Sequence, residues 1–135
     1  MRAAPTEQQI EQIRRSFKRC RAGTADAIID LQRSGDPALI PTIVRGIVWR
    51  YVNKNVQPIL EQATPETPLT SLGIDSLTMM EIVLDVQDAL DLVIEDADLR
   101  RMHTIGDVIE FLQERFAQVH QDVCRQGSHR SIGKL

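Results

Sequence analysis

The stretch Leu72–Thr78 reads "LGIDSLT", and it decides where the central helix of this chain begins. Gly73 allows a tight backbone turn that side-chain-bearing residues resist. Asp75 is a good N-cap, because its carboxylate accepts hydrogen bonds from the free amides of a first helical turn. Ser76 then stands at the start of the helix, where the positive end of the helix dipole favours an attached phosphate. The junction therefore suits a phosphate ester on Ser76.

A catalytic serine at this position would need a base within hydrogen-bond reach. The chain has three histidines, and only His103 falls within the expected folded module. The residues two before and two after Ser76 are Ile74 and Thr78, so the G-x-S-x-G nucleophile elbow is absent. Taken alone, Asp75 and Ser76 are also compatible with a plain helix cap. We therefore do not expect Ser76 to act as a catalytic nucleophile.

The rest of the chain has helical periodicity, with Pro and Gly between the segments and no convincing two-residue alternation. The expected fold class is all-α. The expected helices cover residues 6–21, 25–33, about 37–55, 76–90 and 104 onward, with short turns over 96–102. Gly23 should stop the first helix and Thr24 should cap the second. Asp96 is the expected cap of the short turns, and Thr104 with Asp107 forms a capping-box-like start for the last helix.

Trp49 lies off the main apolar stripe of the expected third helix, residues 37–55. That stripe consists of Ile40, Val44, Ile47, Val48 and Tyr51. At about 100° per residue, Trp49 points to nearly the opposite side, close to Gly46. A glycine there permits close approach of another helix. We expect the N-terminal helices to pack on this second face.

Charge is distributed unevenly along the 135 residues, although the formal net charge is only -3. Residues 39–118 carry six Lys/Arg and thirteen Asp/Glu, whereas residues 1–38 and 119–135 are each mildly basic. An acidic module is attracted to basic partner surfaces and repelled by nucleic-acid phosphates. Aromatic residues make up only 4% of the chain, which disfavours a base-stacking surface. We therefore expect no nucleic-acid partner.

The cysteines and the apolar runs indicate the compartment. Cys20 and Cys124 are far apart and form no CxxC pair, which suits a reducing cytosol. No apolar run is long enough to span a membrane, and the N-terminus lacks the apolar core of a secretory signal. We expect a cytoplasmic monomer that is not an integral membrane protein.

A longer segment, Leu69–Leu112, resembles an acyl carrier protein without a gap. The residues that carry the resemblance are the loop Leu72–Leu77, the core Glu81–Val83, the step from Ile94 into the acidic Glu95 and Asp96, and the start Thr104–Ile105. The resemblance extends over roughly residues 39–116. It says nothing about residues 1–38.

This resemblance implies a fold and a function. The fold would be an acyl-carrier-type four-helix bundle, with three long helices and one short, and with extra N-terminal helices. The implied organisation is a helical extension over 1–38, an acyl carrier domain over 39–118, and a helix end with a flexible tail over 119–135. Ser76, flanked by Asp75 and Leu77, would receive 4′-phosphopantetheine from coenzyme A through a separate phosphopantetheinyl transferase. The protein would carry acyl intermediates as thioesters for fatty acid, polyketide or specialised lipid synthesis, and would not be an enzyme.

The resemblance also implies two sets of contact residues. The expected acyl pocket comprises Val83, Leu90, Ile94, Leu99, Met102 and Ile109. The expected docking residues for partner enzymes with basic surfaces are Thr78, Met79, Glu81, Asp85 and Asp88. Carriers of fatty acid synthesis usually place an acidic residue where Thr78 and Met79 stand, so a specialised partner set is expected.

Other interpretations stay open. A peptidyl or aminoacyl carrier uses the same arm, although such carriers more often show Gly-Gly where this chain has Gly73-Ile74. A helical adaptor that has lost the arm is the alternative from another class.

The basic segment 14–21 could be a solvated face, a docking element for an acidic partner or membrane surface, or a mask over the acidic face. No metal is expected, because His120 and Cys124 supply only two ligands and residues 95–98 lack the spacing of an EF-hand.

Overall fold

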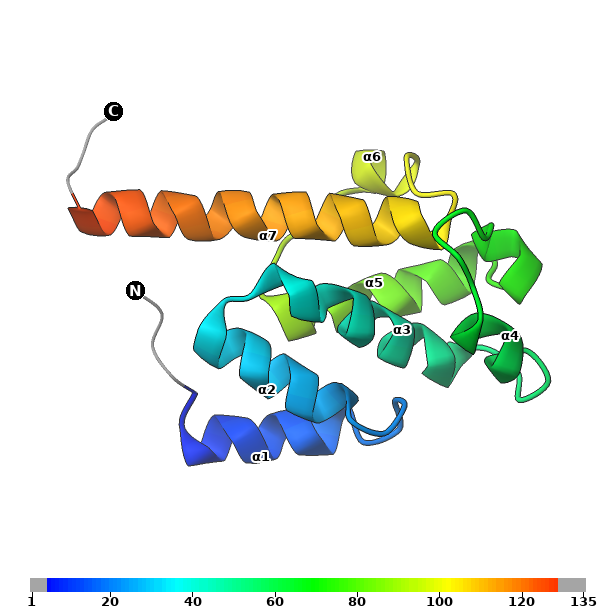
Figure 1. Cartoon of the computed structure of the whole chain (residues 1–135), viewed down its shortest axis with the longest axis horizontal. Helices are drawn as coiled ribbons and strands as arrows, with labels where there is room; N and C mark the ends of the chain where they lie inside the picture. The colour runs from blue at the N-terminus through cyan, green and yellow to red at the C-terminus, as the bar shows by residue number, and fades with distance from the viewer. Residues whose placement is uncertain (1–4, 129–135) are drawn as a thin grey trace.

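The structure is a computed structural model that describes residues 5–128, with side chains described over residues 5–119. Every regular element in this part of the chain is helical, which confirms the all-α prediction. The main bundle consists of the long helices α3 (Ile40–Tyr51), α5 (Ser76–Leu90) and α7 (Ile105–Ser128), together with the short α6 (Asp96–Leu99). In Figure 1, α7 runs along one side of α3 and α5, and the N-terminal helices lie on the other side of α3.

The start of α5 is formed by local interactions, as predicted. The preceding 3₁₀ turn η2 (Leu69–Leu72) ends at Gly73, whose φ of 77° is in the left-handed region. Asp75 then caps the helix by accepting a hydrogen bond of 2.8 Å from the Thr78 amide. The helix ends at Leu90, where Asp91 adopts a positive φ of 54°.

The N-terminal helices α1 (Glu7–Ser16) and α2 (Thr24–Ser34) are present, but α1 ends earlier than predicted. Beyond Ser16 the chain turns, so that Phe17 and Cys20 enter the core. The Arg21 amide then donates a hydrogen bond of 3.2 Å to the carbonyl of Gly46 on α3. The chain after α1 therefore contacts a distant helix. Helical periodicity within residues 6–21 cannot show such a contact, so it could not show where α1 ends.

Thr24 differs from its predicted role as an N-cap. Gly23, in the left-handed conformation, is the cap residue of α2, and Thr24 is the first residue of the helix. The Thr24 side chain is only 2% exposed and fills the space over Gly46. A Cβ on Gly46 would come within 1.9 Å of the Thr24 hydroxyl oxygen. The close approach predicted at Gly46 is confirmed, and α2 is the helix that makes it.

Residues 5–38 and residues 39–119 share one hydrophobic core. Residues from both segments belong to a single cluster of buried side chains. The N-terminal contribution consists of Ile13, Phe17, Cys20, Ala27, Ile28, Ile29 and Leu31. In the described chain, residues 5–38 are therefore packed into the bundle and do not form a separate appendage.

Three short elements, η2 among them, were not predicted as separate helices, and the end of one long helix moved. The turn η1 (Pro37–Leu39) precedes α3, and α4 (Gln57–Glu61) follows it. Helix α3 ends at Tyr51 instead of Asn55, because Val52 adopts an extended conformation and is buried. The guanidinium of Arg45 donates to the carbonyls of Leu60 and Ala63 at 3.1 and 3.0 Å, which secures the end of α4.

The helices that follow α5 begin at capped positions. The N-cap of α6 is Glu95 instead of the predicted Asp96, and the Asp98 carboxylate accepts a hydrogen bond of 3.0 Å from the Glu95 amide. The predicted start of α7 is confirmed: the Thr104 hydroxyl accepts from the Asp107 amide at 3.0 Å, and Asp107 accepts from the Thr104 amide at 3.1 Å. Helix α7 continues to Ser128. The rest of the predicted tail, residues 129–135, lies outside the described residues.

Candidate functional site

Ser76 is exposed at the first position of α5. Asp75 beside it is engaged by backbone amides of the first turn, chiefly that of Thr78, and these hydrogen bonds lower the pKa of the Asp75 carboxyl. Within the described residues, the Ser76 hydroxyl has no hydrogen-bond partner and therefore no base that would activate it. The arrangement presents a free hydroxyl at a helix N-terminus, which suits a phosphate ester.

Ser76 lines a surface groove of about 670 Å³. Its apolar walls include Ile74, Met79, Leu99 and Met102, and its polar lining includes Asp75, Asp96, Arg100 and His103. His103 makes no hydrogen bond to Ser76, so the groove contains no serine–histidine pair. A flexible chain attached at Ser76 would have a partly apolar surface on which to lie.

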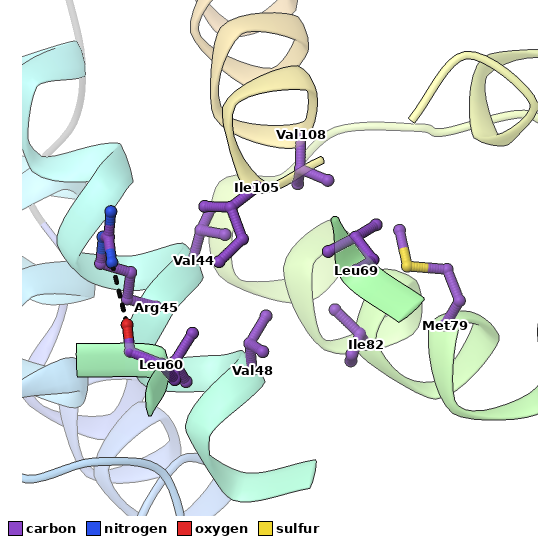
Figure 2. A pocket seen from close by; sticks show the side chains of 9 residues that line it. All are labelled: Val44, Arg45, Val48, Leu60, Leu69, Met79, Ile82, Ile105 and Val108. Carbon is purple, nitrogen blue, oxygen red and sulfur yellow. Dashed lines mark hydrogen bonds between the residues drawn. The ribbon is translucent and has the colours of Figure 1, made fainter. Parts of the chain in front are cut away.

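A second, closed cavity lies inside the bundle (Figure 2). It is lined by Val44, Arg45, Val48, Leu60, Leu69, Met79, Ile82, Ile105 and Val108. Its volume of about 10 Å³, measured for the centre of a water-sized sphere, is enough for about one water molecule. Figure 2 shows the Arg45 guanidinium turned to the Leu60 carbonyl, so the lining that faces the cavity is aliphatic. Met79 and Leu69 line both this cavity and the groove, and they form the wall between them.

The six residues expected to form the acyl pocket lie in different places. Leu99 and Met102 line the groove at Ser76. Val83 and Leu90 are buried, Ile94 is half-buried, and Ile109 lines a separate groove near the start of α7. None of the six lines the internal cavity. Periodicity identified which side chains face inward, but it could not show which inward-facing side chains meet one another.

The outer face of α5 carries an exposed apolar stripe. Leu77, Met80 and Leu84 are 70%, 55% and 59% exposed, and their spacing places them on one side of the helix. Glu81 and Asp88 are exposed beside them. Met80 and Leu84 are not among the docking residues predicted from the sequence. Both residues lie on the side of α5 opposite its buried residues, and their helical spacing from Leu77 could have identified them as part of an exposed apolar stripe.

Asp85 does not lie on this outer face, contrary to expectation. Its carboxylate accepts a hydrogen bond of 2.5 Å from the Tyr51 hydroxyl and one of 3.4 Å from Arg50, and the side chain is 22% exposed. Burial and the hydrogen bond to Asp85 raise the pKa of Tyr51. Burial, and then the charge of Asp85, raise the pKa of the Cys20 thiol to about 11. Asp85 therefore joins α5 to α3 instead of facing solvent.

The family model described as the phosphopantetheine attachment site matches residues 46–112. This match includes the start of α5, the groove and the apolar stripe. It places the chain in the class of phosphopantetheine-dependent carriers.

Curated relatives identify the family within this class. The chain is 35% identical over 74 residues to an acyl carrier protein of Desulforapulum autotrophicum, a match that covers 53% of this chain and 96% of the relative. It is 32% identical over 72 residues to an acyl carrier protein of Phenylobacterium zucineum, covering 53% and 87%. A third, from Exiguobacterium sp., is 43% identical over 44 residues, covering 33% of this chain and 56% of the relative. No solved structure matches the chain significantly. The chain belongs to the acyl carrier protein family.

Membership in this family establishes the general role. The protein is a carrier that uses a 4′-phosphopantetheine prosthetic group, and it is not an enzyme. Its role requires partner enzymes for phosphopantetheinylation and for acylation. Among the helices of residues 5–128, none has the length and apolar composition needed to cross a membrane. The side chains of His120 and Cys124 lie outside the described residues.

Proposed function

We propose that Ser76 carries the 4′-phosphopantetheine arm, and that the protein carries acyl intermediates for fatty acid, polyketide or specialised lipid synthesis. The observation that supports this most directly is the exposed, unpartnered Ser76 hydroxyl at the start of α5, in the lining of the groove. The residues present fit the arm, because the helix N-terminus favours a phosphate and the groove offers apolar surface to a flexible chain. The bound arm supplies a thiol that forms thioesters. The bond-forming chemistry would belong to partner enzymes, so Ser76 needs no base.

The acyl chain would enter the bundle through the wall formed by Met79 and Leu69. The internal cavity is far too small for a chain in the structure described, so entry requires this wall to move. Met79 is suited to such movement, because it is half-buried and its unbranched thioether side chain adapts to different surroundings. Leu99 and Met102 would contact the chain at the entrance. Val83, Leu90, Ile94 and Ile109 would contact it only if the bundle opens further.

The partner enzymes would dock on the outer face of α5. The docking surface that we propose contains the apolar residues Leu77, Met80 and Leu84 and the acidic residues Glu81 and Asp88, with Thr78 at its upper end. Met79 was predicted to belong to this surface, but its side chain instead lines the cavity and the groove. Asp85 is excluded because Tyr51 and Arg50 already bind it. Partners would therefore present an apolar patch with basic residues at its rim, and the apolar contacts would provide much of the affinity.

Incubation of the full chain with coenzyme A and a promiscuous phosphopantetheinyl transferase tests the attachment site. Intact-mass measurement should show one phosphopantetheine adduct on the wild type and on Ser71→Ala, and none on Ser76→Ala. Ser71 is a matched control, because it is an exposed serine five residues away whose hydroxyl is bound to the Pro68 carbonyl. An adduct that survives Ser76→Ala would overturn the assignment. A wild type that takes no adduct would favour the adaptor interpretation.

The docking surface can be tested in the same reaction by its rate. Leu84→Asp should lower the kcat/KM of arm transfer by about fivefold or more, since loss of a central apolar contact can cost more than about 1 kcal/mol. Val93→Asp is the control, because Val93 is 71% exposed but lies beyond the end of α5. Equal effects of the two substitutions would refute the proposed surface.

A further inference from the structure

Arg100 is a cationic side chain without a partner in the groove at Ser76. It directly follows α6, is exposed, and lines the groove together with Ser76. Three other arginines of the bundle are engaged: Arg45 binds carbonyls, Arg50 binds Asp85, and Arg115 binds Asp98 and the Val93 carbonyl. Within the described residues, Arg100 has no hydrogen bond or ion pair. Its guanidinium is therefore available to a ligand in the groove.

The acidic groups of the groove do not occupy this guanidinium. Asp75 is held by the amides of the first turn of α5. Asp96 stands four residues before Arg100 at the opposite end of α6, but the two side chains form no ion pair in the structure. His103 is a further nitrogen-bearing side chain in the lining. A cation and a potential hydrogen-bond donor thus share a groove with the residue that would carry a phosphodiester.

We propose that Arg100 binds the phosphodiester of the prosthetic arm and holds the arm along this groove. This inference rests on the attachment at Ser76 that is proposed above. A guanidinium suits the task, because its planar donors bind phosphate oxygens in pairs and it remains charged at all ordinary pH values. Met79, Leu99 and Met102 provide apolar surface for the aliphatic part of the arm. The arm would then lie next to the wall through which an acyl chain has to pass.

The test compares apo and holo forms of the full chain by ¹H–¹⁵N and ³¹P NMR, for the wild type, Arg100→Gln and Arg101→Gln. Arg101 is the matched control, because it is the adjacent exposed arginine and does not line the groove. Intact mass first establishes that each protein carries the arm. Arm attachment should shift the amide signals of residues 99–103 and the Arg100 Nε–H signal in the wild type. Arg100→Gln should at least halve the amide shifts and change the ³¹P shift, and Arg101→Gln should change neither.

Three outcomes would overturn the inference. If Arg100→Gln behaves as the wild type, or if both substitutions act equally, Arg100 has no specific role. If the shifts appear with a malonyl-loaded arm but not with a free or acetyl-loaded arm, the anion bound is a carboxylate of the cargo and not the phosphodiester. A wild type that fails to take the arm refutes the Ser76 attachment itself, and the mass measurement shows this before any spectrum is recorded.

Discussion

Gly46→Ala tests whether the N-terminal helices are part of the carrier fold, because the sign of its effect depends on their packing. At a solvent-facing position inside a helix, replacing glycine by alanine raises stability by about 1 kcal/mol. Gly46 instead faces Thr24, which is buried at the start of α2. We therefore expect this substitution to destabilise the protein.

The magnitude follows from the contacts that the added methyl group would make. It would lie 1.9 Å from the Thr24 hydroxyl oxygen and 2.9 Å from both Thr24 Cβ and Cγ2. Rotation of the Thr24 side chain does not move its Cβ, so α2 has to move away from α3. Overpacking of this kind costs about 1–3 kcal/mol, and weakening the bond from the Arg21 amide to the Gly46 carbonyl adds about 1 kcal/mol. After the propensity gain of about 1 kcal/mol is deducted, the expected net loss is about 1–3 kcal/mol.

Urea unfolding followed by Trp49 fluorescence measures this loss, because Trp49 is the sole tryptophan and packs against the core from α3. Thr42→Ala, at an exposed position of the same helix, is the control and should change the free energy of unfolding by no more than about 0.5 kcal/mol. The double variant Thr24→Ala/Gly46→Ala lacks the Thr24 hydroxyl, which is the group nearest to the added methyl group. Its free energy of unfolding should be about 1 kcal/mol higher than the sum of the two single effects predicts. A Gly46→Ala protein that is about 1 kcal/mol more stable than the wild type would refute the packing of α2 on α3.

Three further predictions concern the same bundle. Tyr51→Phe should lower the free energy of unfolding by about 1–3 kcal/mol, because it removes a hydrogen bond to the charged and partly buried Asp85; an unchanged urea midpoint would contradict this. Hydrogen bonds from the backbone amides of His103 and Thr104 lower the pKa of Asp107 in the folded protein. As the pH falls, this carboxylate is therefore protonated in the unfolded chain before it is protonated in the folded one. The free energy of unfolding should decrease as the pH drops below about 4. Asp107→Asn should flatten that part of a Tm-against-pH curve, and a curve parallel to that of the wild type would count against the cap. Deletion of residues 1–36 should remove the buried N-terminal part of the core. Because each buried aliphatic side chain contributes about 1.5–3 kcal/mol, the Tm should fall by at least 10 °C. A truncated chain with the Tm of the full chain would show that the extension is dispensable for stability.

The parts of the fold that could be predicted depend on interactions within a few residues. Gly73 and Asp75 place the start of α5, and Thr104 with Asp107 places the start of α7, through backbone conformations and caps that the sequence spells out locally. The attachment-site hypothesis belongs to the same category, because Ser76 follows directly from the cap. Gly46 beside Trp49 also indicated a second packing face.

What could not be predicted depends on contacts between distant segments. The end of α1 at Ser16 and the burial of Thr24 both depend on Gly46 of α3, which lies more than twenty residues away along the chain. Asp85 was expected to face solvent, because a helical pattern does not show that Tyr51 and Arg50 stand opposite it. The lining of the internal cavity was missed for the same reason.

The sequence by itself therefore determined the all-helical fold class, the starts of the two carrier helices, the resemblance to acyl carriers and the serine proposed to hold the arm. Only the tertiary structure decided which face of α5 is free, which groove Ser76 opens into, and that Arg100 stands unpaired beside it. The physical reason is the range of the interactions. A cap is made by neighbours along the chain, whereas the exposure of a face and the pairing of a charge depend on which distant helices come to lie against it.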